Sequence, residues 1–165
     1  MNPIPKENII EEVEKIISTG KPVELKVEGK SMRPYLRSGK DVIVLFPCHP
    51  GDLKRGDIVL FCYENNYIFH RIIRIENDKL LIQGDGVINR YETALKSDVI
   101  GIVQQIIRPD GKRVSTHGLS SEIYWRCWLF LHPFRHLLLA FYDSPSRFFH
   151  RIAASFLPQH SYRAG

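Results

Sequence analysis

The stretch that decides the fold is EGKSMRPYLRSGKDVIV, residues 28–44. An alternating segment, VELKV at residues 23–27, runs into Gly29, and the stretch itself ends in an apolar run. This pattern predicts two strands joined by a corner with Ser31 at its centre. Pro34 fixes its own φ and keeps the preceding residue out of the helical region, which stiffens the corner. The corner either presents the Ser31 hydroxyl to a substrate or is an ordinary turn.

The composition indicates a globular protein with a localised positive charge. The chain has 165 residues, of which 44% are hydrophobic, enough for one domain with a core. Its net charge of +5 lies mostly beyond residue 119. Such a charge suits an anionic membrane surface or an acidic partner, and because no nucleic-acid module is recognisable, no nucleic-acid partner is expected.

The cysteines and the N-terminus indicate the compartment. Three widely spaced cysteines without a Cys-x-x-Cys pair favour a reducing environment, and we expect neither a metal site nor a cofactor. The first twenty residues contain four glutamates and no continuous apolar run, so neither a signal peptide nor an N-terminal membrane anchor is expected. The expected location is the cytoplasm, with peripheral contact at the inner face of the membrane as a further expectation.

Helical and strand periodicities divide the first two thirds of the chain. Residues 7–18 place apolar side chains at helical spacing and are followed by Gly20, which predicts an amphipathic helix that covers the sheet or, alternatively, binds a partner. Asn and Asp after two of the apolar runs favour hairpin turns, so consecutive strands should pair in an antiparallel sheet. The predicted strands are 23–27, 42–46, 57–63, 67–76, 79–83 and 99–108.

The segment 67–76 carries a histidine between isoleucines. Strand alternation puts His70 on one face and Arg71 on the other. The first face is predicted to carry Ile68, His70, Ile72 and Arg74, and the second Phe69, Arg71, Ile73 and Ile75. Taken alone, His70 is either a core or edge histidine with satisfied ring nitrogens or a catalytic base.

Five motifs occur in an order that resembles a known family. They are GKSMRP at 29–34, LKRGDIV at 53–59, HRIIRI at 70–75, QGDG at 83–86 and VIGIV at 99–103. Together they resemble the signal peptidase I family and its relatives, the LexA-type self-cleaving repressors. The resemblance implies a mainly β fold with a coiled, mostly antiparallel, barrel-like sheet. It also implies a serine endopeptidase that cleaves precursors after small side chains.

The resemblance assigns roles to individual residues. Ser31 would be the nucleophile, and His70 followed by Arg71 resembles the family's histidine type, in which the base is histidine rather than lysine. Asp85 would orient the base as a third catalytic residue, or else pair with Arg71, or serve only as a turn residue. Glu92 is a second candidate for that third role.

The chemistry of a serine nucleophile supports this assignment independently. A serine hydroxyl needs a base to attack an amide, and a neutral imidazole with a pKa near ~6.5 can supply it. Lys54 and Lys79 lie in solvated turns where their pKa would stay near ~10.4, so we do not expect either to act as the base.

The expected oxyanion donor is a backbone group of the corner. The N–H of Ser31 is the nearest donor, in a loop shaped by Gly29, Met32 and Pro34. Some members of the family carry a hydroxyl two positions before the nucleophile, where this chain, like other members, has glycine, Gly29. The oxyanion hole would therefore rest on backbone groups.

The C-terminal segment is rich in aromatic residues. Ser120 is predicted to cap a helix that runs toward Tyr142 and is kinked near Pro133, and a second helix is predicted over 144–158. The segment from residue 119 contains 11 of the 18 aromatic residues. It suits either a helix on a bilayer surface anchored by Trp125 and Trp128, or a helical lid or dimer surface that packs on protein.

These observations predict three parts: a helix at 1–20, a β peptidase domain at 21–118 and a helical tail at 119–165. The first function hypothesis is an endopeptidase that removes leader or signal-like segments from a precursor peptide or protein. The alternative is a catalytically silent peptide-binding or regulatory module that docks a partner or membrane through the tail. No feature of the sequence fixes the oligomeric state.

Overall fold

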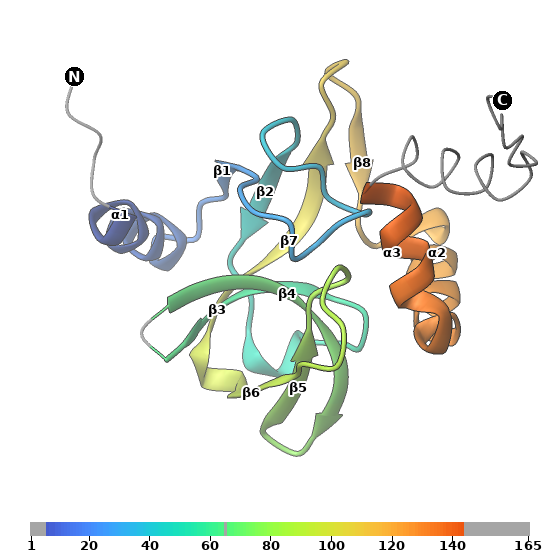
Figure 1. Cartoon of the computed structure of the whole chain (residues 1–165). Helices are drawn as coiled ribbons and strands as arrows, with labels where there is room; N and C mark the ends of the chain where they lie inside the picture. Colours follow the sequence, from blue (N-terminus) through green and yellow to red (C-terminus); the bar gives the residue numbers. More distant parts are fainter. Residues whose placement is uncertain (1–5, 65, 144–165) are drawn as a thin grey trace, which may run out of the picture.

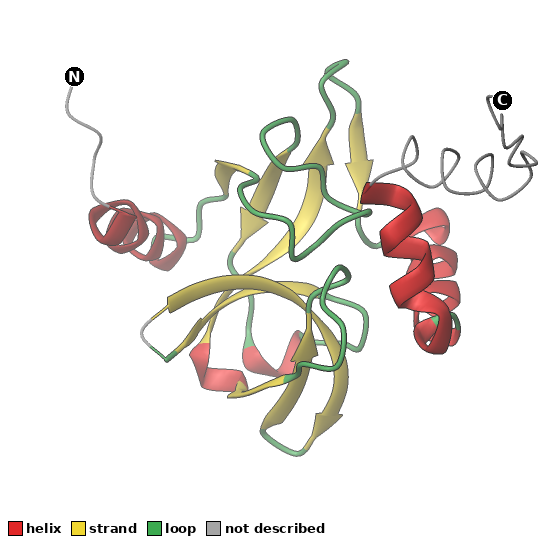
Figure 2. Cartoon of the chain, in the orientation of Figure 1, coloured by secondary structure: helices red, strands yellow, loops and turns green. Residues whose placement is uncertain are grey.

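The computed structural model describes residues 6–64 and 66–143, which form one antiparallel sheet with helices at both ends of the chain (Figures 1 and 2). The sheet order is β1-β2-β7-β3-β4-β5-β6, with β8 also paired to β7. The two end strands, β1 and β6, are not paired with each other, so the sheet is coiled but not closed. The predicted mainly β, antiparallel fold is confirmed. The helices and strands are α1 (Lys6–Ser18), β1 (Val23–Lys26), β2 (Val42–Phe46), β3 (Ile58–Tyr63), β4 (Asn66–Glu76), β5 (Lys79–Gln83), β6 (Glu92–Leu95), β7 (Val99–Ile107), β8 (Arg113–Ser115), α2 (Leu119–Phe130) and α3 (Arg135–Asp143), with short 3₁₀ turns at Pro50–Asp52, Lys96–Asp98 and His132–Phe134.

Strand β3 separates two hydrophobic cores. Its residues Ile58 and Leu60 face a core shared with α1, β2 and β7, which we call the first core. Val59 and Phe61 face a core shared with β4, β5 and β6, the second core. All four side chains are at most 1% exposed, because the strand alternates between two packed faces. This central strand therefore contributes side chains to both cores.

Helix α1 covers the first core, as its periodicity predicted. Val13 and Ile17, one turn apart, are buried in that core. The helix is followed by Gly20 at φ +81°, whose N–H donates to the carbonyl of Ile17 over 2.9 Å. A glycine just after the last helical turn ends the helix without strain from a Cβ.

A β-bulge in β4 changes which face its second half presents. The register against β5 shifts between Ile72 and Arg74, so Ile73 has no paired partner. Up to Ile72 the predicted alternation holds, and Ile68 and Ile72 both face the second core. Beyond the bulge the phase inverts, and Ile75 also packs on the second core. The prediction that Ile75 shares a face with Arg71 was therefore wrong.

Two short strands have no counterpart in the sequence prediction. Strand β6 pairs with β5, and strand β8 pairs with β7 at the opposite side of the sheet. Their sequences, ETAL and RVS, lack the repeated alternation of apolar and polar residues that VELK shows in β1. Strand β6 matters for the site, because it carries Glu92.

The C-terminal helices pack on the sheet domain through their tryptophans. Helix α2 is capped by Gly118 rather than by the predicted Ser120, and the chain turns near Pro133 as expected. Trp125 and Trp128 are buried against protein, so they are not membrane anchors. Figure 1 shows α2 and α3 side by side at the end of the molecule away from α1. The second predicted helix, 144–158, lies outside the described residues.

The contact between Trp125 and Gly56 docks helix α2. Gly56 has φ +98°, and a Cβ there would lie 2.5 Å from the indole of Trp125. We expect Gly56→Ala to lower the free energy of unfolding by about 2–4 kcal/mol, since it combines backbone strain with overpacking. Both tryptophans of the chain lie in α2, so intrinsic fluorescence reports on its docking and should shift to longer wavelength.

Gly111 is the matched control for that substitution. It has φ +80° but nothing within 4 Å of its Cβ position. Gly111→Ala should cost only the backbone strain, about 1–2 kcal/mol, and leave the fluorescence unchanged. Equal fluorescence for the two variants would contradict this account of α2 docking.

Candidate active site

The loop that carries Ser31 joins β1 to β2 and is closed at its base by backbone hydrogen bonds. The N–H of Gly39 donates to the carbonyl of Val27 over 2.8 Å, and the N–H of Val27 donates to the carbonyl of Asp41 over 2.9 Å. The buried Asp41 carboxylate accepts hydrogen bonds from Arg37 and Arg108. These hydrogen bonds hold both ends of the loop, which agrees with the stiff corner expected from its glycines and Pro34.

The middle of the loop is anchored in the first core. Met32 is buried there, together with Tyr35 and Leu36. Pro34 follows a cis peptide bond, and Gly29 has φ +85°, a conformation that favours glycine. Ser31 is half-buried, between an exposed and a buried segment. Three packed side chains next to the serine limit the movement of its backbone.

His70 lies on β4, facing the second core, with its ring held from one side. Its Nδ1 lies 3.0 Å from Oε2 of Glu92, and both side chains are almost completely buried. Nε2 is also buried, and within the described residues it has no hydrogen-bond partner. A buried nitrogen without a hydrogen-bond partner lowers the free energy of unfolding by about 1–3 kcal/mol, so an unpaired Nε2 indicates a role in function.

Burial governs the protonation of His70. It lowers the pKa of the imidazole below its ordinary value, outweighing the opposite effect of the Glu92 carboxylate. The ring is therefore neutral at pH 7. With Nδ1–H donating to Glu92, Nε2 carries the lone pair.

Gly84 lies between the serine and the histidine. A Cβ on Gly84 would be 2.5 Å from the carbonyl oxygen of Ser31 and 2.8 Å from Nε2 of His70. The next glycine, Gly86, donates its N–H to the same Ser31 carbonyl over 2.7 Å. Both glycines are required because any side chain would push the loop away. The structure therefore brings Ser31 and His70 together across a loop that has room for backbone only.

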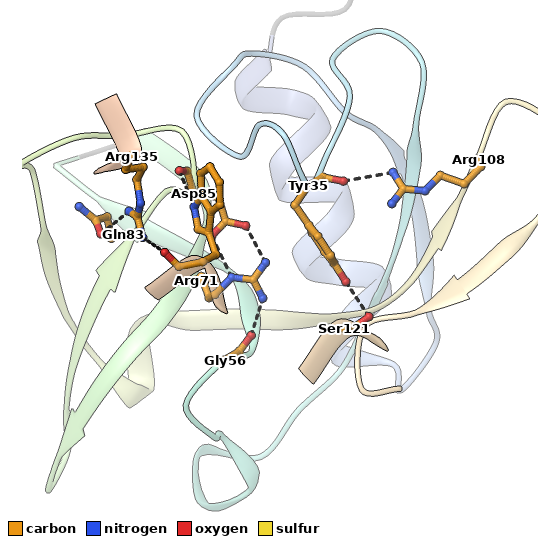
Figure 3. Close-up of polar contacts among 9 residues, drawn as sticks. Tyr35, Gly56, Arg71, Gln83, Asp85, Arg108, Ser121 and Arg135 are labelled. Carbon is orange, nitrogen blue, oxygen red and sulfur yellow. Dashed lines mark hydrogen bonds and ion pairs between the residues drawn. The ribbon is translucent and has the colours of Figure 1, made fainter. Parts of the chain in front are cut away.

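Asp85 forms a buried ion pair with Arg71 (Figure 3). Nε and Nη2 of Arg71 donate to the two carboxylate oxygens over 2.9 and 2.7 Å, and Nη1 donates to the carbonyl of Gly56. Although burial disfavours the charge on Arg71, Asp85 outweighs it and raises the pKa of that guanidinium. The carboxylate that contacts the His70 imidazole therefore belongs to Glu92. Asp85 is the partner of Arg71, which was the alternative role expected for it.

Residues of the C-terminal helices also hold this loop, which the sequence did not predict. The indole N–H of Trp128 donates to the carbonyl of Asp85 over 2.9 Å, and Arg135 donates to the side chain of Gln83 over 2.9 Å (Figure 3). Arg135 is itself 2% exposed. The sequence contains one hint of this contact, an arginine in a mostly apolar helical segment. Arginine is rarely buried without a partner, so a buried Arg135 would need a polar group to contact.

Glu92 was identified from the sequence only as the weaker candidate. Its strand alternates, with Glu92 and Ala94 buried and Thr93 and Leu95 exposed. Ile82, a residue of the second core, is its paired neighbour on β5. A carboxylate at an inward position of a strand is the signal that could have placed it beside His70.

The fold is mainly β, and it places the loop of Ser31 next to His70 and its partner Glu92. A family model described as signal peptidase, peptidase S26, matches residues 15–120. The chain belongs to that family. A search of curated proteins found no match. The match covers the sheet domain with Ser31, His70, Asp85 and Glu92, and ends at the start of α2.

The close approach at Gly84 gives a direct test of the site. We expect Gly84→Ala to reduce peptidase activity by about 100-fold or more, since the added methyl displaces Ser31 relative to His70. Gly51→Ala is the control, because nothing lies within 4 Å of that Cβ position. The measurement is kcat/KM on a peptide substrate, with thermal unfolding of both variants. Full activity in Gly84→Ala would contradict the geometry.

Proposed function

We propose that this protein is a serine endopeptidase that removes leader or signal-like segments from precursor peptides or proteins. Membership of the family supports peptidase action on such segments. The observation that carries the assignment to residues is the buried, unpaired Nε2 of His70 beside the Ser31 backbone, with Nδ1 held by Glu92. Because Glu92 fixes Nδ1, Nε2 is the nitrogen that can accept a proton from a hydroxyl next to the Ser31 backbone.

In the proposed reaction, Ser31 Oγ attacks the scissile carbonyl while its proton passes to Nε2 of His70. The imidazolium that forms is stabilised by Glu92 and then gives its proton to the leaving amine. Water repeats the sequence on the acyl-enzyme and regenerates the hydroxyl. This step requires Ser31 Oγ to come within hydrogen-bond distance of Nε2, a contact that the structure does not contain.

Backbone groups of the corner can supply the oxyanion hole. Among the described residues, the N–H groups of Ser31 and Met32 donate to no other group. Preformed donors of this kind contribute roughly 2.7–4 kcal/mol each to transition-state stabilisation. Gly29 brings no hydroxyl to this region, which agrees with a hole built from backbone alone.

Cleavage of a pool of leader-like peptides tests the proposal. Wild type should cut after small residues, whereas Ser31→Ala and His70→Ala should lose at least about 100-fold in kcat/KM. Fluorescence and thermal unfolding should show both variants folded. If wild type cuts none of the peptides, the endopeptidase assignment fails and a peptide-binding module takes its place.

The pH dependence of kcat/KM tests the role of Glu92. Activity should rise with pH as His70 loses its proton, with a midpoint below the ordinary value of ~6.5 because burial lowers the pKa of His70. Since Glu92 raises that pKa, Glu92→Gln should move the midpoint to still lower pH and reduce kcat/KM roughly tenfold. A midpoint that stays in place in Glu92→Gln would contradict the contact.

We also propose that the protein acts at the inner face of a membrane, with α2 and α3 against anionic lipid. No helix within the described ranges is long and apolar enough to span a bilayer. The outer surface of these helices is instead strongly apolar, and the segment from residue 119 carries a net positive charge. Apolar side chains with nearby arginines suit an anionic interface. The exposed side chains include Leu119, Ile123, Phe130, Phe134 and Leu137.

Vesicle co-sedimentation tests this location. Wild type should bind vesicles that contain anionic lipid more strongly than purely zwitterionic ones. Replacing Phe130 and Leu137 by Ser should weaken binding roughly tenfold or more, since two apolar side chains no longer enter the interface. Leu95→Ser, an exposed leucine on β6, is the control and should bind normally. Equal binding by all three proteins would exclude this surface.

A further inference from the structure

A positively charged cavity lies beside the loop that carries Ser31. It has a volume of about 210 Å³ and is bounded by the loop and by Tyr142 of α3. The loop residues Gly29 and Lys30, which directly precede Ser31, form part of its wall. The cavity therefore opens within one residue of the proposed nucleophile.

Within the part of the chain that the structure describes, four cationic side chains line the cavity, and no acidic side chain does. They are Lys30, Arg33, Arg37 and Lys40. Neither Lys30 nor Lys40 forms an ion pair with another described residue. Arg37 pairs with Asp41, but the same carboxylate also pairs with Arg108, so one negative charge serves two guanidiniums. The cavity keeps an excess of positive charge.

Arg37 is also held in place. The Asp41 carboxylate accepts from its Nε over 3.0 Å and from its backbone N–H over 2.8 Å. Asp41 is 0% exposed, so the anchor is rigid. A cation fixed by a buried partner loses little side-chain entropy when it binds a second anion. The hydroxyl-bearing ring of Tyr142 completes the wall with a group that can donate to a carboxylate.

We propose that this cavity binds an acidic side chain, Asp or Glu, of the precursor close to its scissile bond. The inference rests on the proposed endopeptidase function and adds a specificity element to it. A peptide that reaches Ser31 must pass the adjacent residues Gly29 and Lys30, whereas the apolar surface proposed for lipid lies on the helices. The position of the cavity on the nucleophile loop therefore favours substrate over an anionic lipid headgroup as the source of the carboxylate or phosphate charge.

Paired peptides that differ only in Glu or Gln test the proposal. The substitution is scanned through the positions on either side of the scissile bond. At one position, wild type should cleave the Glu peptide with a kcat/KM roughly tenfold higher, mainly through KM, and added salt should reduce that ratio. Lys30→Gln combined with Lys40→Gln should bring the ratio close to one. Lys21→Gln combined with Lys79→Gln, two exposed lysines elsewhere, should leave the ratio unchanged.

A binding measurement separates failure of the inference from failure of the proposed function. Ser31→Ala is titrated with the same labelled peptides, and the Glu peptide should bind with a lower Kd than the Gln peptide. If neither cleavage nor binding depends on charge at any position, the cavity does not bind an acidic side chain. The proposed endopeptidase function is then unaffected. Absence of cleavage would overturn the endopeptidase, and the Kd ratio would still decide the cavity. If the Lys30/Lys40 double substitution weakens binding to anionic vesicles but not the peptide preference, the site is a lipid contact and the proposal is wrong.

Discussion

The buried ion pair between Arg71 and Asp85 is the contact on which the site depends. It joins β4 to the loop after β5, and through Gly56 it also joins the turn before β3 (Figure 3). The guanidinium lies 4.8 Å from the ring centre of Tyr35, a residue of the nucleophile loop. Removing one partner of such a pair costs about 3–5 kcal/mol, although the pair as a whole need not add stability. The pair positions the loop, because it holds the backbone of Gly84 in the narrow space between Ser31 and His70.

The alternation of a β-strand explains why the pair and the base are neighbours in sequence. His70 and Arg71 point to opposite faces of β4. His70 meets Glu92 on the side of the second core, and Arg71 meets Asp85 and Tyr35 on the side of the first. Two adjacent residues thus supply a neutral imidazole and a permanent cation without direct competition between their environments. The C-terminal helices reinforce the arrangement from outside, since Trp128 binds the backbone of Asp85.

Much of the fold could be predicted because its local signals agree with its packing. Helix α1 and six of the eight described strands followed from periodicity, and the loop around Ser31 followed from glycine and proline positions. The bulge in β4 could not be predicted, because an extra unpaired residue leaves no composition signal. The same inversion of phase misplaced Ile75.

The site was predictable in its members but not in its pairing. Ser31 and His70 followed from motifs, whereas the choice between Asp85 and Glu92 depends on which strand lies beside His70. Strand β6, ETAL, was not recognised because its apolar and polar residues do not alternate, so its carboxylate was not placed beside His70. The role of the tryptophans stayed open at the level of the sequence for a related reason. The sequence pattern of aromatic residues in a helix does not distinguish contact with lipid from contact with protein, such as that of Trp125 with Gly56.

The tautomer of His70 is the most direct test of the central claim. Imidazole ¹H–¹⁵N correlation spectra at neutral pH, with the signal assigned by comparison with His70→Gln, report the protonation of each ring nitrogen. The ring should be neutral, with the proton on Nδ1 toward Glu92 and an unprotonated Nε2 toward Ser31. A proton on Nε2 at neutral pH, in the neutral or the charged ring, would contradict the claim.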